Sequence, residues 1–208
     1  MPLNKVRLEM VRGSISEDDV VCDVGGGQKP FNRADYIIDI QGFDEGFKAG
    51  SYGDNVRVDK SRWVKLDINR DRFPFKDNFF DFVFCTHTLE DIYNPFHAID
   101  EISRVGRRGY IETPSARWEL SKGVSYRGII GAPHHKWIIY KEKDRIVFVE
   151  KNQLISKRKH HMKKRGLTEE NSYMVFFWDE TIEYEIKCFV HDIDFKRFVR
   201  GLIDKVRT

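Results

Sequence analysis

Short apolar runs recur along the first half of the chain, each bounded by glycine or polar residues. Runs of this length are typical of strands that are buried on both faces of a parallel sheet. They predict strands at 20–24, 36–40, 63–68, 79–85 and 109–113. Between the last two, apolar residues recur every three or four positions from Leu89 to Val105, which predicts an amphipathic helix ended by Gly106. The alternation of strands and crossovers predicts an α/β fold, with a parallel sheet and helices on both of its faces.

The second half of the chain has a less regular pattern. It predicts strands near 137–140 and 145–149 and a helix over 151–166. The runs 173–178 and 184–190 flank a short polar turn, which predicts an antiparallel C-terminal hairpin. A final helix is expected over 195–206. The sheet as a whole should therefore be mostly parallel, with the antiparallel pair near the C-terminus.

Composition narrows the class of protein. With 208 residues, 40% hydrophobic and 13% aromatic, the chain has enough apolar side chains to form one domain over 1–208. The net charge is only +3, which by itself does not indicate a nucleic-acid-binding protein. No apolar run approaches the length that spans a bilayer. The three cysteines, Cys22, Cys85 and Cys188, are odd in number and widely spaced, which indicates reduced thiols and a cytoplasmic location.

A glycine triplet, Gly25–Gly27, follows the first predicted strand. In an open parallel sheet ligands bind beyond the carboxyl ends of the strands, and glycines there let the backbone approach a ligand closely. A dinucleotide site would require a third spaced glycine and a helix after the turn. Here Gln28-Lys29-Pro30 follows, and the next strand begins too soon for a helix. This spacing counts against NAD.

Aspartates accompany the ends of the first three predicted strands, at Asp23, Asp39 and Asp67. Carboxylates at the tips of adjacent strands can accept hydrogen bonds from a ribose diol and an amine, and they favour a cationic ligand. The alternative is that Asp39 and Asp67 only cap the loops that follow their strands, which is a common use of aspartate.

At this point the sequence resembles the class I S-adenosylmethionine-dependent methyltransferases, specifically the type 11 group. The matching stretches lie in order over roughly residues 20–115: Val21 to Gly27, Asp39, Leu66-Asp67-Ile68, Phe73 to Val83, Thr86 to Asp91, and Ile102 to Val105. The resemblance implies a Rossmann-like class I methyltransferase sheet, methyl transfer as the activity, and S-adenosyl-L-methionine as the cofactor.

The same resemblance implies roles for individual residues. Asp23 with Gly25, Gly26 and Gly27 would hold the methionine part of the cofactor. Asp39 would bind the ribose hydroxyls and Asp67 the adenine amine, while Ile40 and Ile68 pack on the adenine faces. Cys85, Thr86 and His87 would lie alongside the sulfonium end of the cofactor. The chain departs from the family in two places: Pro30 and Phe31 replace the helix after the glycines, and Asp91 replaces a residue that is often histidine.

The methyl acceptor decides what further chemistry is needed. A hydroxyl acceptor requires a base or a metal to take its proton, whereas a nitrogen or thiolate needs little more than positioning. The catalytic candidates are His134, His135, His87 and Asp91, with Glu90 and Glu112 as further carboxylates. In an extended segment the adjacent His134 and His135 would point to opposite sides, so only one would face the site. Loop histidines with ordinary hydrogen bonds are the alternative.

No metal site is expected from this pattern. The chain has no C-x-x-C pair, which argues against zinc. The consecutive Glu90 and Asp91 would diverge on a helix and make a poor chelate.

Residues 116–150 are the expected acceptor-site insertion. They contain Trp118, Tyr126, Trp137 and Tyr140, whose aromatic faces suit a sugar as well as they suit a core. The segment Pro133-His134-His135-Lys136-Trp137 also resembles methyltransferases from glycan-assembly gene clusters. We therefore expect O-methylation of a sugar hydroxyl on a glycan or sugar nucleotide.

The sequence is also compatible with three different functions. The basic run 157–165 could follow RNA phosphates in an RNA methyltransferase, or it could be a solvated surface. The chain could instead methylate protein, or be a non-catalytic, methyltransferase-fold partner subunit. The sequence leaves the oligomeric state undetermined.

Overall fold

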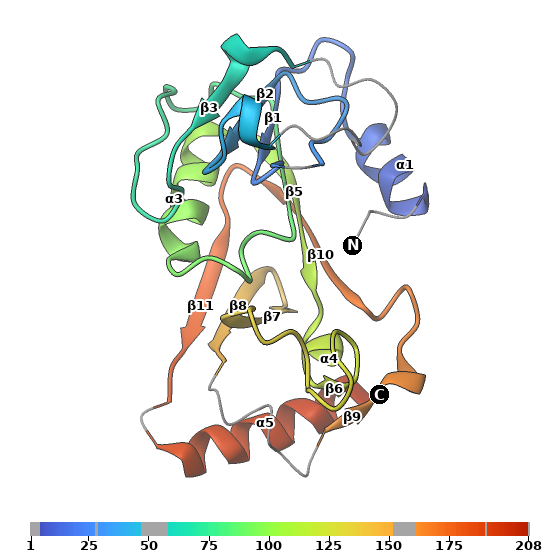
Figure 1. Ribbon diagram of the computed structural model, residues 1–208. Helices are drawn as coiled ribbons and strands as arrows, with labels where there is room; N and C mark the ends of the chain where they lie inside the picture. The colour runs from blue at the N-terminus through green and yellow to red at the C-terminus, as the bar shows by residue number, and fades with distance from the viewer. Residues whose placement is uncertain (1–4, 28, 47–57, 152–160, 190, 208) are drawn as a thin grey trace. The chain divides into compact units, whose positions relative to one another are not determined.

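The computed structural model describes residues 5–27, 29–46, 58–151, 161–189 and 191–207 (Figure 1). The chain divides into two compact units. The first unit comprises residues 1–89, 93–111 and 177–182, and the second comprises 90–92, 112–176 and 183–208. None of the helices in the described part of the chain has the length and apolar character needed to span a bilayer.

All the strands that lie wholly within the first unit belong to a six-stranded sheet. Its strands, in the spatial order β10-β5-β4-β1-β2-β3, are β10 (Tyr173–Asp179), β5 (Arg108–Pro114), β4 (Phe82–Thr86), β1 (Val21–Val24), β2 (Tyr36–Asp39) and β3 (Trp63–Lys65). β1 pairs in parallel with both β2 and β4, and β2 pairs in parallel with β3. An order of 3-2-1-4-5 among the first five strands is that of the Rossmann-like fold, which confirms the expected fold class.

The described residues of the first unit contain fewer helices than the alternating pattern predicts. Its helices are α1 (Lys5–Gly13), α2 (Phe43–Gly46), the 3₁₀ turn η1 (Lys60–Arg62) and α3 (Pro95–Val105). Among the described residues between β1 and β2 there is no helix, in keeping with the short spacing. Phe31 occupies part of this connection, fully buried and stacked on Phe84 of β4 at 4.5 Å between ring centroids.

The predicted helix over 89–105 begins six residues late. Residues 89–94 form turns, and α3 starts only at Pro95, with the Asn94 side chain accepting a hydrogen bond from the His97 backbone N–H. Proline suits the first turn of a helix but disfavours helical backbone in the residue before it, so the helix starts here. Asp91 therefore lies on a turn and not on a helix.

The second unit has a smaller sheet and its own core. Its elements are α4 (Ala116–Glu119), β6 (Ser121–Lys122), β7 (Trp137–Glu142), β8 (Arg145–Glu150), β9 (Met162–Lys163), the 3₁₀ turn η3 (Lys164–Gly166), β11 (Glu183–Lys187) and α5 (Asp192–Arg207). β7 and β8 pair antiparallel, as neighbours in a three-stranded sheet that β11 joins. Apolar residues of α4, β7, β8 and α5 form the core, among them Ile138, Val147 and Leu202.

Two predictions for the C-terminal half are wrong. β10 and β11 do not form a hairpin, because β10 joins the six-stranded sheet while β11 pairs in parallel with β8. The described part of the predicted helix 151–166 is also not α-helical, since β9 and η3 occupy 162–166. Residues 152–160 of that prediction lie outside the described residues. The final helix is confirmed as α5.

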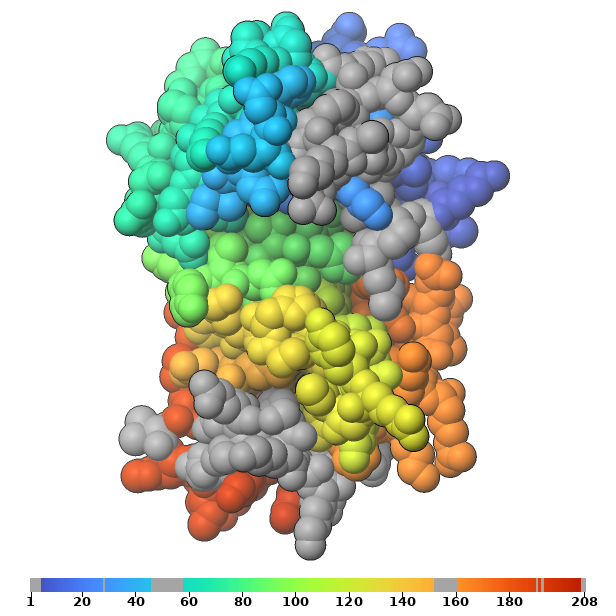
Figure 2. All heavy atoms as spheres, viewed as in Figure 1, coloured from blue at the N-terminus to red at the C-terminus, as the bar shows by residue number. Residues whose placement is uncertain are grey.

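Residues 116–150 all belong to the second unit. In Figure 2 this stretch, coloured yellow-green to gold, forms a continuous patch on the face in view. Its aromatic side chains are nevertheless mostly internal. Trp118, Trp137 and Tyr140 are buried, and Tyr126 is 57% exposed.

Candidate functional site

In the glycine turn after β1, the backbone lies close to β2 and to Thr88. Gly25 donates its N–H to the Ile38 carbonyl of β2 at 2.8 Å and has a φ of +81°. A Cβ at Gly25 would lie 2.1 Å from Thr88 Oγ1, and one at Gly26 would lie 2.4 Å from Asp23 Oδ2. Both positions therefore require glycine.

Asp23 places a carboxyl group beneath this turn. It is almost completely buried, and its Oδ2 accepts a hydrogen bond from the Phe31 backbone N–H at 2.8 Å. Burial raises the pKa of Asp23 to about 7; the nearby Asp39 adds to the rise and the Phe31 N–H opposes it. At neutral pH this carboxyl can therefore hold or release a proton.

Asp39 connects the end of β2 with the glycine turn. Its Oδ1 accepts a hydrogen bond from the Gln41 N–H at 2.7 Å, and a Cβ added at Gly27 would lie 3.1 Å from its Oδ2. Burial raises the pKa of Asp39, against the backbone N–H groups of Gln41, Gly27 and Ile40, which favour the charged form. The carboxylate is thus positioned beside the turn by β2 and held by backbone donors.

Asp67 follows β3 and is more exposed than the other two aspartates. Its Oδ1 accepts hydrogen bonds from the Asn69 side chain at 2.7 Å and from the Asn69 backbone at 3.0 Å. These two donors lower the pKa of Asp67, and Arg70 adds a smaller effect. Asp39 and Asp67 both bond the N–H two residues on, so the loop-capping geometry that the sequence left open is present at both.

The remaining cofactor candidates differ in exposure. Ile40 is 60% exposed directly after Asp39, whereas Ile68 is buried after Asp67. Cys85 and Thr86 are buried at the end of β4, and His87 follows in the left-handed region with a φ of +51°. Because β1, β2 and β4 are parallel neighbours, their carboxyl ends bring these residues to the same edge of the sheet as the glycine turn.

In the second unit the structure brings three catalytic candidates together. Asp91 Oδ1 lies 3.8 Å from His135 Nε2 and 3.9 Å from His134 Nε2. The two imidazole rings meet edge to face, with 4.5 Å between their centroids. The segment is not extended here, because 133–134 form a turn and the His135 N–H bonds back to Ala132, so the condition under which only one histidine would face the site does not hold. The fourth candidate, His87, belongs to the first unit.

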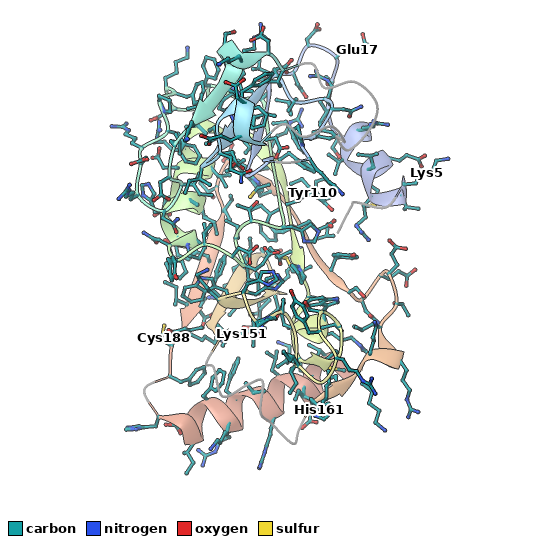
Figure 3. The ribbon with its side chains drawn as sticks, in the orientation of Figure 1. Lys5, Glu17, Tyr110, Lys151, His161 and Cys188 are labelled. Carbon is teal, nitrogen blue, oxygen red and sulfur yellow. The ribbon has the colours of Figure 1, made fainter. Side chains whose placement is uncertain are left out.

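Two charged residues that the sequence did not single out hold His135 in place. The buried Glu119 of α4 contacts His135 Nδ1 through one carboxylate oxygen. Its other oxygen accepts a hydrogen bond from Lys151 Nζ at 2.7 Å, and Lys151 follows β8 (Figure 3). A Cβ at Gly131 would lie 2.4 Å from that second oxygen. The only sequence signal was a charged residue inside the apolar segment Trp118-Glu119-Leu120.

Backbone contacts position the Asp91 turn against β7 within the same unit. The Lys136 N–H donates to the Glu90 carbonyl at 2.7 Å, and the Lys136 ammonium bonds the Asp91 carbonyl. The Trp137 indole N–H donates to the Ile92 carbonyl at 3.0 Å. Three consecutive residues of one turn are thereby tied to the segment that carries both histidines, which keeps the Asp91 side chain beside them.

Comparisons with known proteins give one family match. Residues 34–111 match the sequence model of a family described as a methyltransferase domain. A search of curated proteins found no match. The matched residues include β2, β3, β4 and α3 with Asp39 and Asp67, while Asp23 and the glycine turn precede them.

Several solved structures are similar to the chain. A SAM-dependent methyltransferase from Aquifex aeolicus shares 20% identity and a TM-score of 0.37, covering 52% of this chain and 64% of its own. One from Methanosarcina mazei shares 17% identity and a TM-score of 0.41, covering 58% and 62%. A complex between the Haloferax volcanii Trm112 methyltransferase activator and a methyltransferase gives 20% identity and a TM-score of 0.37, covering 53% and 50%.

The chain thus spans about half to two thirds of the length of these structures. The family match covers β2, β3 and β4 of the six-stranded sheet, with Asp39 and Asp67, and leaves out β1 with Asp23. Residues 34–111 are thus similar in sequence to a methyltransferase domain, and they lie within a sheet of Rossmann-like strand order.

Proposed function

We propose that this protein is an S-adenosylmethionine-dependent O-methyltransferase that acts on a sugar hydroxyl of a glycan or sugar nucleotide. The observation that carries the proposal is the glycine turn with Asp23 and Asp39 packed against it. A Cβ at Gly26 would lie 2.4 Å from Asp23 Oδ2 and one at Gly27 3.1 Å from Asp39 Oδ2, so bare backbone lies directly beside two carboxyl groups. That combination fits a ligand with an amine, a diol and a positive charge.

When bound, S-adenosylmethionine supplies a methyl group on a positively charged sulfur. Asp23 with Gly25–Gly27 would hold the methionine part, and Asp39 would accept hydrogen bonds from the ribose hydroxyls. Asp67 would receive the adenine amine at its Oδ2, which lies 3.4 Å from Arg70 Nε in this structure. The exposed Ile40 is placed to cover one adenine face, and Ile68 would contribute only if its surroundings move, since it is buried.

The acceptor chemistry belongs to the second unit in this proposal. A hydroxyl must lose its proton as its oxygen attacks, and imidazole has a suitable pKa near neutrality. Glu119 fixes the orientation of His135, so that its Nδ1 faces the carboxylate and its Nε2 faces Asp91 and His134. In this proposal the cluster of Asp91, His134 and His135 accepts the proton of the acceptor hydroxyl. The acceptor itself binds at residues 116–150 and the Asp91 turn.

A sugar acceptor is supported by side chains of the predicted acceptor segment 116–150. This segment exposes Tyr126 and Arg127, an aromatic face and a cation that suit a polar ring with an attached phosphate. A second candidate, RNA methylation, is favoured by exposed Lys163, Lys164 and Arg165. The other residues of the predicted basic run, 157–160, lie outside the described residues.

Calorimetry on the full chain tests the cofactor proposal. We expect Asp39→Asn to weaken S-adenosylmethionine binding by about tenfold or more, because the ribose loses a charged acceptor. Asp44→Asn is the matched control, since Asp44 is an exposed aspartate paired with Lys60. Equal affinities in the wild type and Asp39→Asn would contradict the placement. A non-catalytic partner subunit would show no thermal shift with the cofactor.

Incubation with methyl-labelled S-adenosylmethionine identifies the acceptor. Separate pools of glycans, RNA and proteins are offered to the wild-type chain and to a variant with Lys163, Lys164 and Arg165 changed to Gln. We expect label in the glycan pool for both chains. Label that enters RNA and disappears in the variant would replace the sugar proposal with the second candidate.

A further inference from the structure

We propose that Asp91, His134 and His135 form a binding site for a divalent transition-metal ion. One ligand atom from each of the three side chains lies within 4.8 Å of the other two. Two imidazoles and one carboxylate are a ligand set that suits Zn²⁺ and related ions. The sequence pattern placed Asp91 on a helix and gave no sign that the loop with His134 and His135 lies beside it, so no metal site was expected.

The surroundings of the Asp91 carboxylate also favour a bound ion. Its Oδ1 is buried and accepts no hydrogen bond from any residue that the structure describes. It faces two imidazole nitrogens at 3.8 and 3.9 Å, which is too far for hydrogen bonds. Ligand atoms around a tetrahedral zinc ion lie about 3.3–3.5 Å apart, given metal–ligand distances near 2.0–2.1 Å. The two distances to Asp91 Oδ1 are a few tenths of an ångström longer, so small inward movements of the partly exposed Asp91 and His134 side chains would bring the ligands to this spacing.

The residues around the three ligands have the arrangement of a metal centre. A metal-bound histidine usually donates its other ring N–H to a carboxylate, which fixes its tautomer and orientation. Glu119 is that carboxylate for His135, and Lys151 neutralises its second oxygen. The Lys136 ammonium bonds the backbone carbonyl of Asp91, which holds in place the residue that carries the carboxylate. Two of the three ligands are therefore positioned in advance.

The ligand set also leaves the ion open on one side. The His135 side chain is only 8% exposed, whereas those of His134 and Asp91 are 60% and 42% exposed. Three protein ligands with an open position are typical of catalytic rather than structural zinc sites. This use of the site rests on the proposed function. With an ion bound, a hydroxyl at the open position would lose its proton to water more readily, and the histidines would then serve as metal ligands in place of the base role that they have without the ion.

Titration of the full, untagged chain with ZnCl₂ tests the binding itself. The experiment uses a Cys188→Ser background after chelator treatment, because Cys188 is an exposed thiol that would also bind zinc. We expect one equivalent of Zn²⁺ to bind, and Co²⁺ to give the visible absorption of a low-coordinate site. His134→Ala and Asp91→Asn should each weaken binding by about tenfold or more. The matched control, His191→Ala, removes an exposed histidine outside the cluster and should leave binding unchanged.

Two results would overturn the proposal: no stoichiometric binding to the wild type, or equal binding by His134→Ala and Asp91→Asn. His134→Ala is an exposed substitution, so its folding is checked by circular dichroism and is expected to match the wild type. S-adenosylmethionine binding is measured on the same metal-free samples. Intact cofactor binding without Zn²⁺ binding refutes the metal site alone, and Zn²⁺ binding without cofactor binding refutes the methyltransferase proposal alone.

Discussion

The carboxyl group of Asp23 is buried, and burial disfavours its charged form. Burial raises its pKa to about 7 from an ordinary value of 3.8, with Asp39 adding to the rise and the Phe31 N–H opposing it. The folded chain therefore binds this proton more tightly than the unfolded chain. Linkage then requires the free energy of unfolding to fall as the pH rises from about 4 to about 7.

The first prediction concerns this pH dependence. We expect Asp23→Asn to remove up to about 4 kcal/mol of the fall in unfolding free energy, since each pKa unit corresponds to about 1.4 kcal/mol. Urea unfolding of the wild type and the variant across that pH range measures it. Asp44→Asn, at an exposed position, should keep the wild-type slope. A wild-type slope in Asp23→Asn would show that the carboxyl is not protonated in the folded chain.

The second prediction concerns the glycine turn. A methyl group at Gly26 would sit 2.4 Å from Asp23 Oδ2, a distance that forces either the turn or the carboxyl group to move. We expect Gly26→Ala to weaken S-adenosylmethionine binding by about tenfold or more in calorimetry. Gly13→Ala is the matched control, because a Cβ at Gly13 meets no atom within 4 Å. Unchanged affinity in Gly26→Ala would separate the turn from the cofactor.

At the scale of elements, α3 shows how two adjacent residues fix a helix start. Asn94 accepts a hydrogen bond from the His97 N–H, and its own amide donates to the Asn69 carbonyl at 3.1 Å. We expect Asn94→Ala to lower the free energy of unfolding by about 1 kcal/mol or somewhat more, measured by urea denaturation. Asn94→Ser, which keeps a capping oxygen, should lose less. Equal losses in both variants would assign the cost to the Asn69 contact instead.

The strands of the first unit could be predicted from sequence because each is a short continuous apolar run. Val21–Val24 and Phe82–Thr86 are buried along their whole length, and burial on both faces leaves a plain signal. The start of α3 was missed because periodicity continued through 89–94, while the Asn94-Pro95 pair decided the boundary. The C-terminal hairpin failed for another reason. Which strand β11 pairs with depends on tertiary contacts with β8, and no local pattern encodes them.

In the candidate site, too, some residues could be predicted from the sequence and others depend on tertiary contacts. The aspartates after β1, β2 and β3 were predictable, because the carboxyl ends of parallel strands share one edge. The cluster of Asp91, His134 and His135 was not, because its members come from two loops whose backbone is held by long-range bonds such as Lys136 N–H to Glu90. Glu119 and Lys151 join them from 32 residues apart in the sequence.

At the scale of the whole molecule, the candidate functions divide between the two units. Asp23, the glycine turn, Asp39 and Asp67 belong to the first unit, whereas the histidine cluster with Glu119 and Lys151 belongs to the second. Asp91 follows His87 by only four residues in the sequence, so the chain passes directly from one set of candidates to the other. If the proposed function is correct, cofactor binding and acceptor chemistry should respond separately to substitution.

His134→Ala tests this separation. We expect its affinity for S-adenosylmethionine to stay within about twofold of the wild type, because no cofactor candidate lies in the second unit as the structure describes it. Turnover with the labelled acceptor should fall by about a hundredfold, within the range that proton transfer or a metal-bound hydroxyl contributes. His191→Ala, at an exposed position outside the cluster, should retain both properties. Full turnover in His134→Ala would remove the cluster from the reaction, and lost cofactor affinity would show that the two units do not act separately.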